Sequence, residues 1–334
     1  MPKHAKLSPA RPGKPPVIWL LTDNKPGHRN QLKGLGNRLR VLAGASLHWV
    51  DASLIKVPFW RVLLATPPPL QDPELPDPDL IIAAGSSTHR LLLALRKFKK
   101  TRTLVMMKPN FPIRLISAAV IPAHDRVQPS SRVLVTEGVV NAVTPLARIT
   151  EKQEALVLVG GPSPHFAWKD ELILGQILDL ISQHPSWRWT IGSSRRTPQS
   201  LQKQLDPLAG LKVTVVHPQQ TYQDWLSHKL TASRAVWVTP DSMSMVCEAA
   251  TSGVPTGLFE IPARSGSRVA EGVNRLKQEG YVEPFRDHSK VMSGDISKAD
   301  TLWEANRAAL WVLEQGLLPG YHQSGQRNGA GAKP

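Results

Sequence analysis

Short runs of β-branched and other apolar residues alternate along the chain with longer segments in which apolar positions recur every three or four residues. The short runs predict buried strands, and the longer segments predict amphipathic helices. Each predicted strand is followed by a turn that contains Gly, Ser, Thr or Asp. This alternation is typical of βαβ units, and it therefore predicts parallel sheets covered by helices.

The first half of the chain contains one complete set of such elements. Strands are expected at residues 17–22, 47–50, 80–84, 104–107 and 133–135. Helices are expected at residues 29–42, at 60–64, and from the turn at Gly85 through residue 100. In the first of these helices, Leu32, Leu35 and Leu39 recur at helical spacing.

The second half repeats the pattern. Strands are expected at residues 155–159, 188–191, 213–216, 235–238 and 257–260, and helices at 172–183, from 201 onward, at 242–251 and at 300–315. We therefore expect an α/β protein with two Rossmann-like domains, at residues 17–150 and 151–319. The basic segment 1–16 and the Gly-rich segment 320–334 are expected to be disordered tails.

Length and composition narrow the class of protein. A chain of 334 residues can bury two cores, and its single cysteine, Cys247, excludes an internal disulfide framework and a Cys-rich zinc site. No metal-ligand motif such as HExxH is present, so we expect no metal and no cofactor. No apolar run approaches the length of a membrane span, and the N-terminus lacks the apolar region of a signal peptide. We expect a cytoplasmic protein, with peripheral attachment to the inner membrane left open.

The net charge of +15 favours a polyanionic partner. Residues 88–135 hold ten Lys and Arg against one acid, Asp125, and the first sixteen residues add four more basic residues and no acid. The run at residues 91–100 is apolar and then basic. It fits a helix end resting on an anionic membrane, or equally a buried helix with cations at its C-terminus. Nucleic acid is a disfavoured partner because no helix-turn-helix, OB or RRM signature accompanies the charge.

Four turns are candidates for binding a ligand. Ligands of parallel α/β sheets bind beyond the carboxyl ends of the strands, where helix N-termini offer free N–H groups. The turns at residues 23–28, 85–88, 160–163 and 192–197 have this location, and Arg195 and Arg196 add donors suited to phosphate. Each turn could equally be ordinary turn and capping geometry.

The stretch at residues 239–255 is more specific. Asp241 or Ser242 can cap the following helix, and Ser244 and Glu248 are four residues apart and so share one face of it. A carboxylate on that face could accept hydrogen bonds from the hydroxyls of a ribose. The alternative is that Glu248 faces solvent and only supports the helix.

Four motifs carry a resemblance to a known family. In this order, TDNKPGHRNQ, GGPSPHFAW, SSRRTP and VTPDSMSMVCEAATSGVP resemble the mitochondrial-fission ELM family, and the resemblance covers roughly residues 17–318. Members of that family look like GT-B glycosyltransferases. The resemblance therefore implies two Rossmann-like domains facing across a cleft, with a C-terminal helix that returns to the first domain. The predicted helix at 300–315 fits that return.

The resemblance also implies roles for particular residues. A nucleotide sugar would lie against the second domain, with its ribose on Glu248. The other nucleotide-binding candidates are Gly160, Gly161, Ser163, Ser193, Ser194, Arg195, Arg196, Asp241, Ser242 and Ser244. In the first domain, His28 or Asp23 would be the general base for an acceptor hydroxyl. The acceptor-side candidates are Gly27, Gly85, Ser86 and Ser87.

Two functions follow from this resemblance. One is a glycosyltransferase that moves a sugar from a nucleotide-sugar donor to a membrane-associated or lipid-linked acceptor. The alternative is a non-catalytic adaptor on an anionic membrane surface, as the role of the plant relatives in recruiting fission machinery implies.

Overall fold

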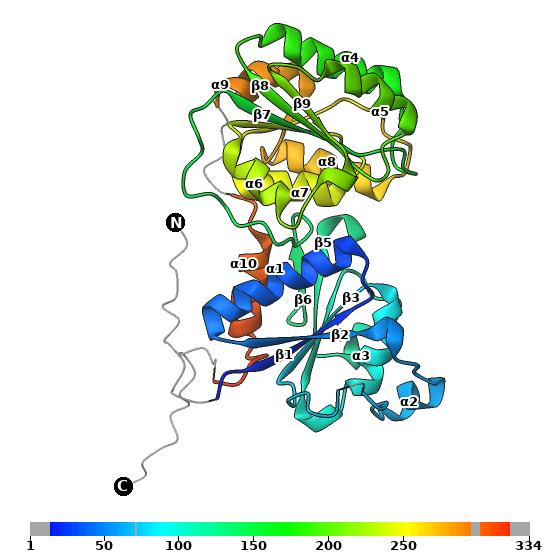
Figure 1. Cartoon of the computed structure of the whole chain (residues 1–334). Coiled ribbons are helices and arrows are strands. Elements are labelled where there is room, and N and C mark those ends of the chain that lie inside the picture. The colour runs from blue at the N-terminus through cyan, green and yellow to red at the C-terminus, as the bar shows by residue number, and fades with distance from the viewer. Residues whose placement is uncertain (1–13, 71, 295–300, 321–334) are drawn as a thin grey trace. The chain divides into compact units, whose positions relative to one another are not determined.

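The computed structural model describes residues 14–70, 72–294 and 301–320, and it divides into two compact units (Figure 1). Unit 1 comprises the chain up to Pro122, Val127–Thr136, and the chain from Ala305 onward. Unit 2 comprises Ala123–Arg126 and Glu137–Glu304. Most of the two expected tails, and the expected first residue of the last helix, lie outside the described residues.

Unit 1 is built on a six-stranded parallel sheet in the order β2-β1-β3-β4-β5-β6. Its strands are β1 (Val17–Thr22), β2 (Ser46–Asp51), β3 (Leu80–Ala84), β4 (Arg102–Met106), β5 (Ala118–Pro122) and β6 (Val133–Thr136). Its helices are α1 (Pro26–Ala43), α2 (Phe59–Leu64), α3 (His89–Leu95) and, from Ala305 onward, α10 (Glu304–Glu314).

Unit 2 is built on a second six-stranded parallel sheet, in the order β12-β11-β10-β7-β8-β9. Its strands are β7 (Glu154–Val159), β8 (Arg188–Ser193), β9 (Val213–Val216), β10 (Ala235–Val238), β11 (Thr256–Leu258) and β12 (Glu283–Pro284). Its helices are α4 (Asp170–Gln183), α5 (Gln199–Leu205), α6 (Trp225–Ala232), α7 (Met243–Ser252), α8 (Arg268–Gln278) and α9 (His288–Ser293).

Single turns of 3-10 helix connect several of these elements. They are η1 (Ala52–Leu54), η2 (Ser86–Thr88), η3 (Phe98–Lys100), η4 (Ile113–Leu115), η5 (Ala123–Asp125), η6 (Asp206–Leu208), η7 (Pro218–Gln220) and η8 (Phe285–Asp287). Lys99 and Lys100 have positive φ angles, so the helix expected to run to residue 100 ends at Leu95. The apolar run of α3 is buried in the core of unit 1, which settles that segment as a buried helix.

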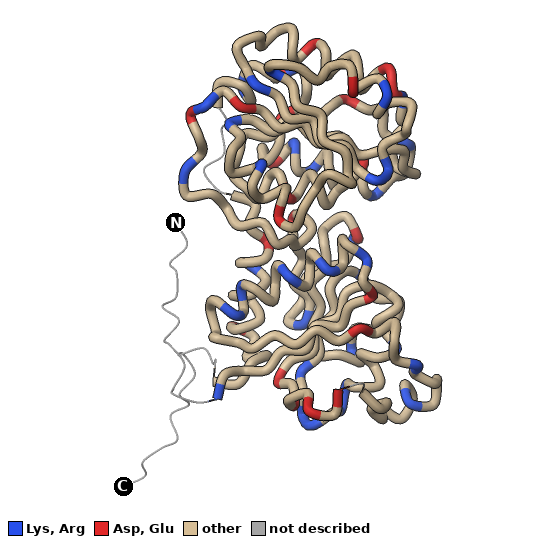
Figure 2. The backbone as a smooth tube through the Cα atoms, in the orientation of Figure 1, with Lys and Arg blue, Asp and Glu red and all other residues tan. Residues whose placement is uncertain are grey.

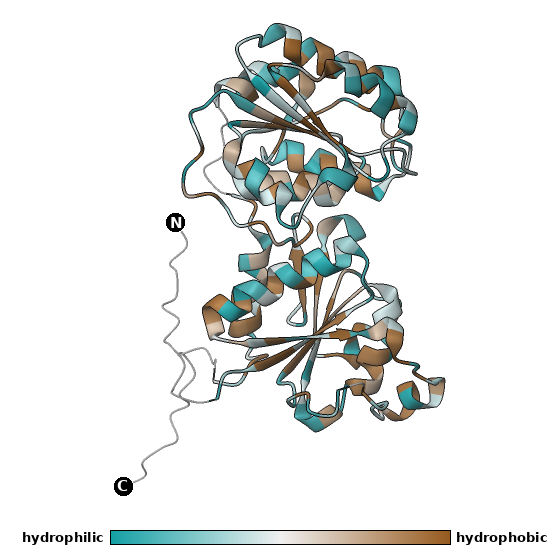
Figure 3. Ribbon diagram, in the orientation of Figure 1, coloured by the Kyte–Doolittle hydropathy of each residue, from teal (hydrophilic) through white to brown (hydrophobic). Residues whose placement is uncertain are grey.

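Both sheets owe their parallel arrangement to strands that are apolar on both faces. Charged residues on the strands stand only at strand ends, so the middle of each sheet carries none of them (Figure 2). The central strands of each sheet are strongly hydrophobic (Figure 3). Every residue of β1, β3 and β5 is buried, as expected when helices cover both faces of a parallel sheet.

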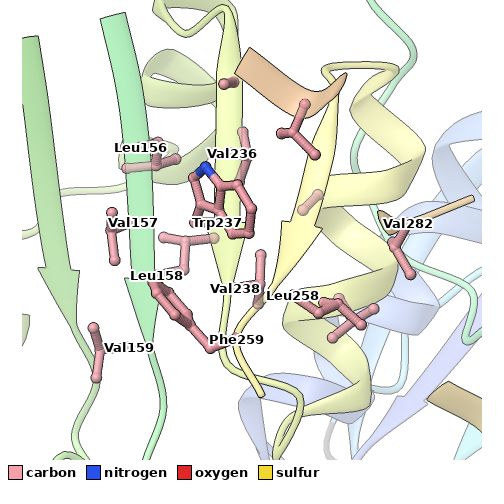
Figure 4. Packing of buried hydrophobic residues seen from close by; sticks show 14 of the residues in the cluster. Leu156, Val157, Leu158, Val159, Val236, Trp237, Val238, Leu258, Phe259 and Val282 are labelled. Carbon is pink, nitrogen blue, oxygen red and sulfur yellow. The ribbon is translucent and has the colours of Figure 1, made fainter. Parts of the chain in front are cut away.

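The core of unit 2 is organised around Trp237, which lies on β10 among the side chains of β7 and β11 (Figure 4). Its ring packs against Phe259 and Phe285, with ring centroids 5.9 and 5.6 Å apart. Gly257 makes room for this ring, because a Cβ there would lie 2.4 Å from Trp237. The glycine in the middle of β11 therefore has a packing cause.

The segment that follows β6 packs with unit 2. The N–H of Val139 donates to the Sγ of Cys247 at 3.3 Å, and the N–H of Leu146 donates to the carbonyl of Ser252 at 2.9 Å. The continuous part of unit 2 therefore begins at Glu137, whereas the sequence suggested a boundary near residue 150. The segment between Glu137 and β7 has no regular secondary structure, so its pattern gave no sign of which unit would hold it.

The expected fold class is confirmed: the chain is an α/β protein with two Rossmann-like parallel sheets. The last helix returns to the first unit, as expected. The guanidinium of Arg38 on α1 donates to Oδ1 of Asn306 at 2.7 Å, and Arg307 donates to the carbonyl of Val135 at 2.8 Å. Within the described residues, no helix combines the length and the apolar character needed to cross a bilayer.

Candidate functional site

The turn after β1 brings together residues that the sequence singled out. Asn24 adopts a positive φ of 62°, which asparagine tolerates better than most residues, and its N–H donates to Oγ1 of Thr22 at 3.0 Å. Pro26 then opens α1, where its missing N–H costs nothing. The sharp turn places Asp23, at the end of the strand, beside His28 in the first turn of the helix.

Asp23 and His28 form a hydrogen-bonded pair. Nδ1 of His28 lies 2.9 Å from Oδ1 and 3.1 Å from Oδ2 of Asp23. The hydroxyl of Ser87 donates to Oδ2 at 2.7 Å, and the N–H of Lys25 donates to Oδ1 at 3.2 Å. The Asp23 side chain is only 4% exposed, whereas that of His28 is 21% exposed. The carboxylate is thus enclosed while the imidazole reaches the surface.

The environment of Asp23 fixes the roles of the two partners. Burial by itself raises the pKa of Asp23, but hydrogen bonds from Ser87, His28 and Lys25 outweigh it, and the net pKa lies below 3.8. Asp23 is therefore ionised at neutral pH and can only accept hydrogen bonds. Nδ1 of a neutral His28 must then carry the proton, which leaves Nε2 with a free lone pair.

Gly85 makes the close approach of the pair possible. It has a φ of +94°, and a Cβ there would lie 2.3 Å from Nδ1 of His28 and 2.8 Å from Oδ2 of Asp23. Of the acceptor-side candidates, Gly85 and Ser87 therefore contact the pair. Ser86 is exposed, and the Cβ position of Gly27 has no neighbour within 4 Å among the described residues.

His89 is a further buried histidine at this edge of the sheet, and the sequence interpretation did not include it. Its Nδ1 lies 2.6 Å from Oδ1 of Asn110, and its ring meets Phe111 edge-on with centroids 5.0 Å apart. Burial holds the pKa of His89 below 6.5. Its position directly after the turn at residues 85–88 was the available signal.

Unit 1 contains a pocket of about 400 Å³, and Ser87 is one of the residues that line it. Lys56 and Arg90 contribute its cationic groups, and Val57 and Pro58 contribute apolar surface. Ser87 belongs both to this pocket and to the hydrogen-bond set of Asp23. A ligand in the pocket would therefore touch the residue that orients the Asp23–His28 pair.

In unit 2, the corresponding edge of the sheet is organised by Asp241, whose side chain is fully buried. Its Oδ2 accepts from the N–H of Gly161 at 3.1 Å and from the guanidinium of Arg196 at 2.7 Å. Its Oδ1 has no hydrogen-bond partner in the described part of the chain and faces Gly160, where a Cβ would lie 2.3 Å away. Asp241 therefore ties the turns after β7 and β8 together.

The two glycines of the turn after β7 have packing roles. The N–H of Gly160 donates to Oγ1 of Thr239 at 2.7 Å, so both of their N–H groups are bonded within unit 2. A Cβ on Gly161 would lie 2.0 Å from the carbonyl oxygen of Arg196. Close backbone approach, rather than free N–H groups, explains these glycines.

The turn after β8 divides its polar groups between two places. Ser194 and Thr197 donate from their hydroxyls to the carbonyl of Gly160 at 3.1 and 2.6 Å, which closes the turn onto β7. Ser193 instead lies 3.2 Å from Nδ1 of His217. Arg195 is exposed and makes no ion pair with any described residue. Thr197, which the sequence interpretation passed over, is the buried member of this set.

Ser163 lies apart from the Asp241 group. Its hydroxyl accepts from the N–H of His165 at 3.3 Å. His165 in turn lies 3.1 Å from the hydroxyl of Ser267, which caps α8 by accepting from the N–H of Ala270. The turn after β7 therefore leads toward the start of α8, a connection that its sequence did not indicate.

Helix α7 starts directly after Asp241, but the expected cap is wrong in detail. Ser242 occupies the N-cap position without a side-chain hydrogen bond to the helix, and the carboxylate of Asp241 is used elsewhere. Ser244 and Glu248 are half-buried on this helix. Cys247 on the same helix is fully buried, and burial raises the pKa of its thiol to about 12, which disfavours the reactive thiolate form.

No metal-binding cluster is found in the part of the chain that the structure describes. In residues 14–70, 72–294 and 301–320, no three His, Cys, Asp or Glu side chains gather closely enough to hold a metal ion. The groups that could act in chemistry here are the imidazole of His28, the carboxylates of Asp23 and Glu248, and the guanidinium of Arg195.

Solved structures with similar folds include UDP-N-acetylglucosamine 2-epimerases. A putative UDP-N-acetylglucosamine 2-epimerase from Listeria monocytogenes is similar with a TM-score of 0.59 and 9% identity, covering 89% of this chain and 94% of that one. A UDP-GlcNAc 2-epimerase from Neisseria meningitidis, solved bound to UDP-GlcNAc, has a TM-score of 0.51 and 13% identity, covering 89% and 98%. At such low identity the likeness shows the fold, which is of the GT-B type.

Comparisons of sequence give the family. An uncharacterized protein of Rickettsia prowazekii, RP120, is 24% identical over 252 residues, which cover 62% of this chain and 69% of that protein. The sequence model of the mitochondrial fission ELM1 family matches residues 26–315, which is most of the chain. Together with the two parallel sheets and the returning C-terminal helix, this match shows that the chain belongs to the mitochondrial fission ELM1 family.

Proposed function

We propose that this protein is a glycosyltransferase that moves a sugar from a nucleotide-sugar donor to a hydroxyl of a membrane-associated or lipid-linked acceptor. The observation that carries the proposal is the Asp23–His28 pair, in which an enclosed carboxylate fixes an imidazole whose Nε2 has no partner among the residues that the structure describes. The GT-B type of fold supports it, since similar structures include an epimerase bound to UDP-GlcNAc.

Unit 1 would supply the base. Nε2 of His28 takes the proton of the acceptor hydroxyl as its oxygen attacks the anomeric carbon of the sugar. The bond between that carbon and the diphosphate oxygen breaks, and the nucleoside diphosphate leaves with the electron pair. Asp23 stabilises the imidazolium that forms, because the same carboxylate already accepts from Nδ1.

Unit 2 would bind the nucleotide. Glu248 is assigned to the ribose hydroxyls, together with Ser242 and Ser244 on the same helix. Arg195 is assigned to the diphosphate, because its guanidinium is exposed and has no acidic partner among the described residues. The turns of Gly160, Gly161, Ser163, Ser193, Ser194, Arg196 and Asp241 would give the binding surface its shape, since most of their polar groups are bonded to one another.

Calorimetry with nucleotides tests the donor half of the proposal. Wild-type protein is titrated with UDP, GDP, ADP, CMP and UDP-GlcNAc, and the nucleotide that binds is titrated into Glu248→Ala. The variant is expected to bind at least about tenfold more weakly, because a carboxylate that accepts two ribose hydroxyls is lost. Glu171→Ala, an exposed carboxylate at the start of α4, is the matched control. If wild-type protein binds none of these ligands, the proposal is wrong.

The base is tested separately. His28→Asn is expected to keep the nucleotide affinity of wild type and to lose about 100-fold or more of the sugar transfer to a membrane lipid extract. His48→Asn on β2 is the control for a change of histidine at this sheet. Equal transfer by wild type and His28→Asn would exclude His28 as the base.

A non-catalytic adaptor on a membrane surface is the second candidate. The exposed apolar side chains on α2 support both candidates, because each of them places the protein at a membrane surface. If the protein is an adaptor, His28→Asn and Glu248→Ala should bind vesicles as wild type does. Wild-type protein should then transfer no sugar from any nucleotide sugar that it binds.

A further inference from the structure

Five large apolar side chains are exposed together in and just before α2. Leu54, Phe59, Trp60, Leu63 and Leu64 are between 50% and 68% exposed, and we call them the α2 surface. Elsewhere in the described residues, exposed large apolar side chains stand singly or in pairs along the chain. Figures 1 and 3 show α2 at the periphery of unit 1, beside α3, with strongly hydrophobic positions on it.

The exposure of this surface is built into the fold of unit 1. The guanidinium of Arg96, at the end of α3, donates to the carbonyls of Val62 and Leu63, the latter at 3.0 Å. Arg61 donates to the carbonyl of Pro67, and Ala65 closes the helix with a φ of 53°. None of the six residues of α2 is buried, although the helix packs against α3. The backbone is thus held in place while the apolar side chains point away from the core.

Cations predominate around the α2 surface, although Asp51 caps η1, which contains Leu54, and Asp77 pairs with Lys99 at 2.8 Å. Residues 52–70 contain Lys56 and Arg61 and no acidic residue, and residues 89–100 contain five Lys and Arg and no acidic residue. Lys56, Arg90 and Lys97 are exposed and make no ion pair with a described residue. An exposed apolar patch of this kind marks an interaction site, and its cationic border selects an anionic partner.

The side chains themselves favour a lipid surface over a protein. The guanidinium of Arg61 lies over the Trp60 ring, 4.6 Å from the ring centroid. The two side chains together therefore combine a large apolar ring with a cationic group. Such amphipathic groups collect where hydrocarbon meets head groups. Leucine and phenylalanine with a cationic border are the composition of segments that lie in the interface of a bilayer.

We propose that the α2 surface inserts into the head-group region of an anionic phospholipid bilayer. Trp60, Phe59, Leu63 and Leu64 enter the boundary between head groups and acyl chains, and the surrounding cations contact lipid phosphates. Lys56 and Arg90 also line the pocket that ends at Ser87. Docking at α2 would therefore bring a lipid-linked acceptor close to Ser87, whose hydroxyl donates to Asp23 of the Asp23–His28 pair. This last step rests on the proposed function, whereas the docking does not.

Cosedimentation with vesicles tests the docking. The full chain is mixed with vesicles of phosphatidylcholine alone, or of phosphatidylcholine and phosphatidylglycerol in equal parts. We expect binding to the anionic vesicles only. The double variant Trp60→Ser/Leu63→Ser should bind them at least about tenfold more weakly, because both side chains are lost from the bilayer. Leu178→Ser/Leu211→Ser, which changes two exposed leucines of unit 2, should bind as wild type.

A charge variant tests the second element of the surface. Lys97→Glu should weaken binding to the anionic vesicles about tenfold or more and lower its sensitivity to salt, because an attractive charge that salt would screen becomes a repulsive one. Circular dichroism and thermal unfolding of each variant should match wild type, since all of the replaced side chains are exposed. If wild type fails to bind anionic vesicles, or the double variant binds them equally well, the docking proposal is wrong.

Two further results distinguish docking to lipid from self-association and from the proposed function. If the protein self-associates through α2, so that wild type is a dimer, the double variant a monomer and neither binds vesicles, the partner is a second copy and the proposal is overturned. Calorimetry of Trp60→Ser/Leu63→Ser with nucleotide should match wild type. Vesicle binding without any nucleotide binding would remove the proposed function and leave the docking standing.

Discussion

Asp23 and Asp241 are both buried carboxylates that follow a strand of a parallel sheet, one in each unit, yet their partners give them different roles. Asp23 accepts from His28, whose ring is partly exposed and has a second nitrogen to offer. Asp241 accepts from the backbone of Gly161 and from Arg196, and so joins two turns of its own unit. Of these two carboxylates at strand ends, one therefore orients a partly exposed imidazole and the other holds the scaffold of its unit together.

The two glycines beside these carboxylates give the largest expected difference. Gly161→Ala places a methyl group 2.0 Å from a backbone carbonyl that cannot move away, so unit 2 should lose about 3 kcal/mol or more of unfolding free energy. In Gly85→Ala the nearest obstacles are the side chains of His28 and Asp23, together with a positive φ. This variant should lose about 1–2 kcal/mol and break the pair. Chemical denaturation of both variants measures the difference.

Replacing each carboxylate by its amide sharpens the comparison. Asp241→Asn leaves Arg196 without its anion and weakens the bond from Gly161, and unfolding should become easier by about 2 kcal/mol. Asp23→Asn should cost about 1 kcal/mol and remove most of the sugar transfer, because an amide does not hold Nδ1 of His28 as a donor. Asp179→Asn, an exposed residue of α4, is the control. An unchanged transfer rate in Asp23→Asn would contradict the role of the pair.

The stability of unit 1 should decrease at acidic pH, and this effect should be smaller than the effects of the substitutions above. Burial holds the pKa of His89 below 6.5, so its contribution to stability is complete above pH 6.5 and is lost as the pH falls through the lower, folded value. Asp23, whose pKa lies below 3.8, contributes above that pH and loses its contribution in stronger acid. Thermal unfolding at about pH 7 and about pH 5 should show a smaller decrease in Tm for His89→Gln than for wild type.

Most of the fold could be predicted because its strands are strongly apolar. The structure places β1, β3, β9 and β10 on the residues that the pattern indicated. Strand β5 escaped prediction because Ala118 and Ala119 are poor strand formers and Pro122 ends it. Helix α8 escaped because its apolar stripe is narrow and the rest of the helix is polar.

The candidate site was predictable in location but not in its connections. The sequence placed Asp23, His28 and Asp241 at strand ends, where ligands of parallel sheets bind. Whether a carboxylate meets an imidazole or a guanidinium depends on long-range packing and on local angles such as the positive φ of Asn24 and Gly85. For the same reason the α2 surface appeared in the sequence only as a short apolar helix; its exposure depends on Arg96, more than thirty residues later in the chain.

Hydrogen exchange measured with and without the nucleotide that binds in calorimetry tests the division of roles between the two units most directly. We expect the ligand to slow exchange in unit 2, at residues 192–197 and in α7 around Glu248, while the turn from Asp23 to His28 exchanges as before. The same pattern should persist in His28→Asn and disappear in Glu248→Ala. Protection confined to the Asp23–His28 turn, or no protection anywhere at saturating ligand, would contradict the assignment of nucleotide binding to unit 2.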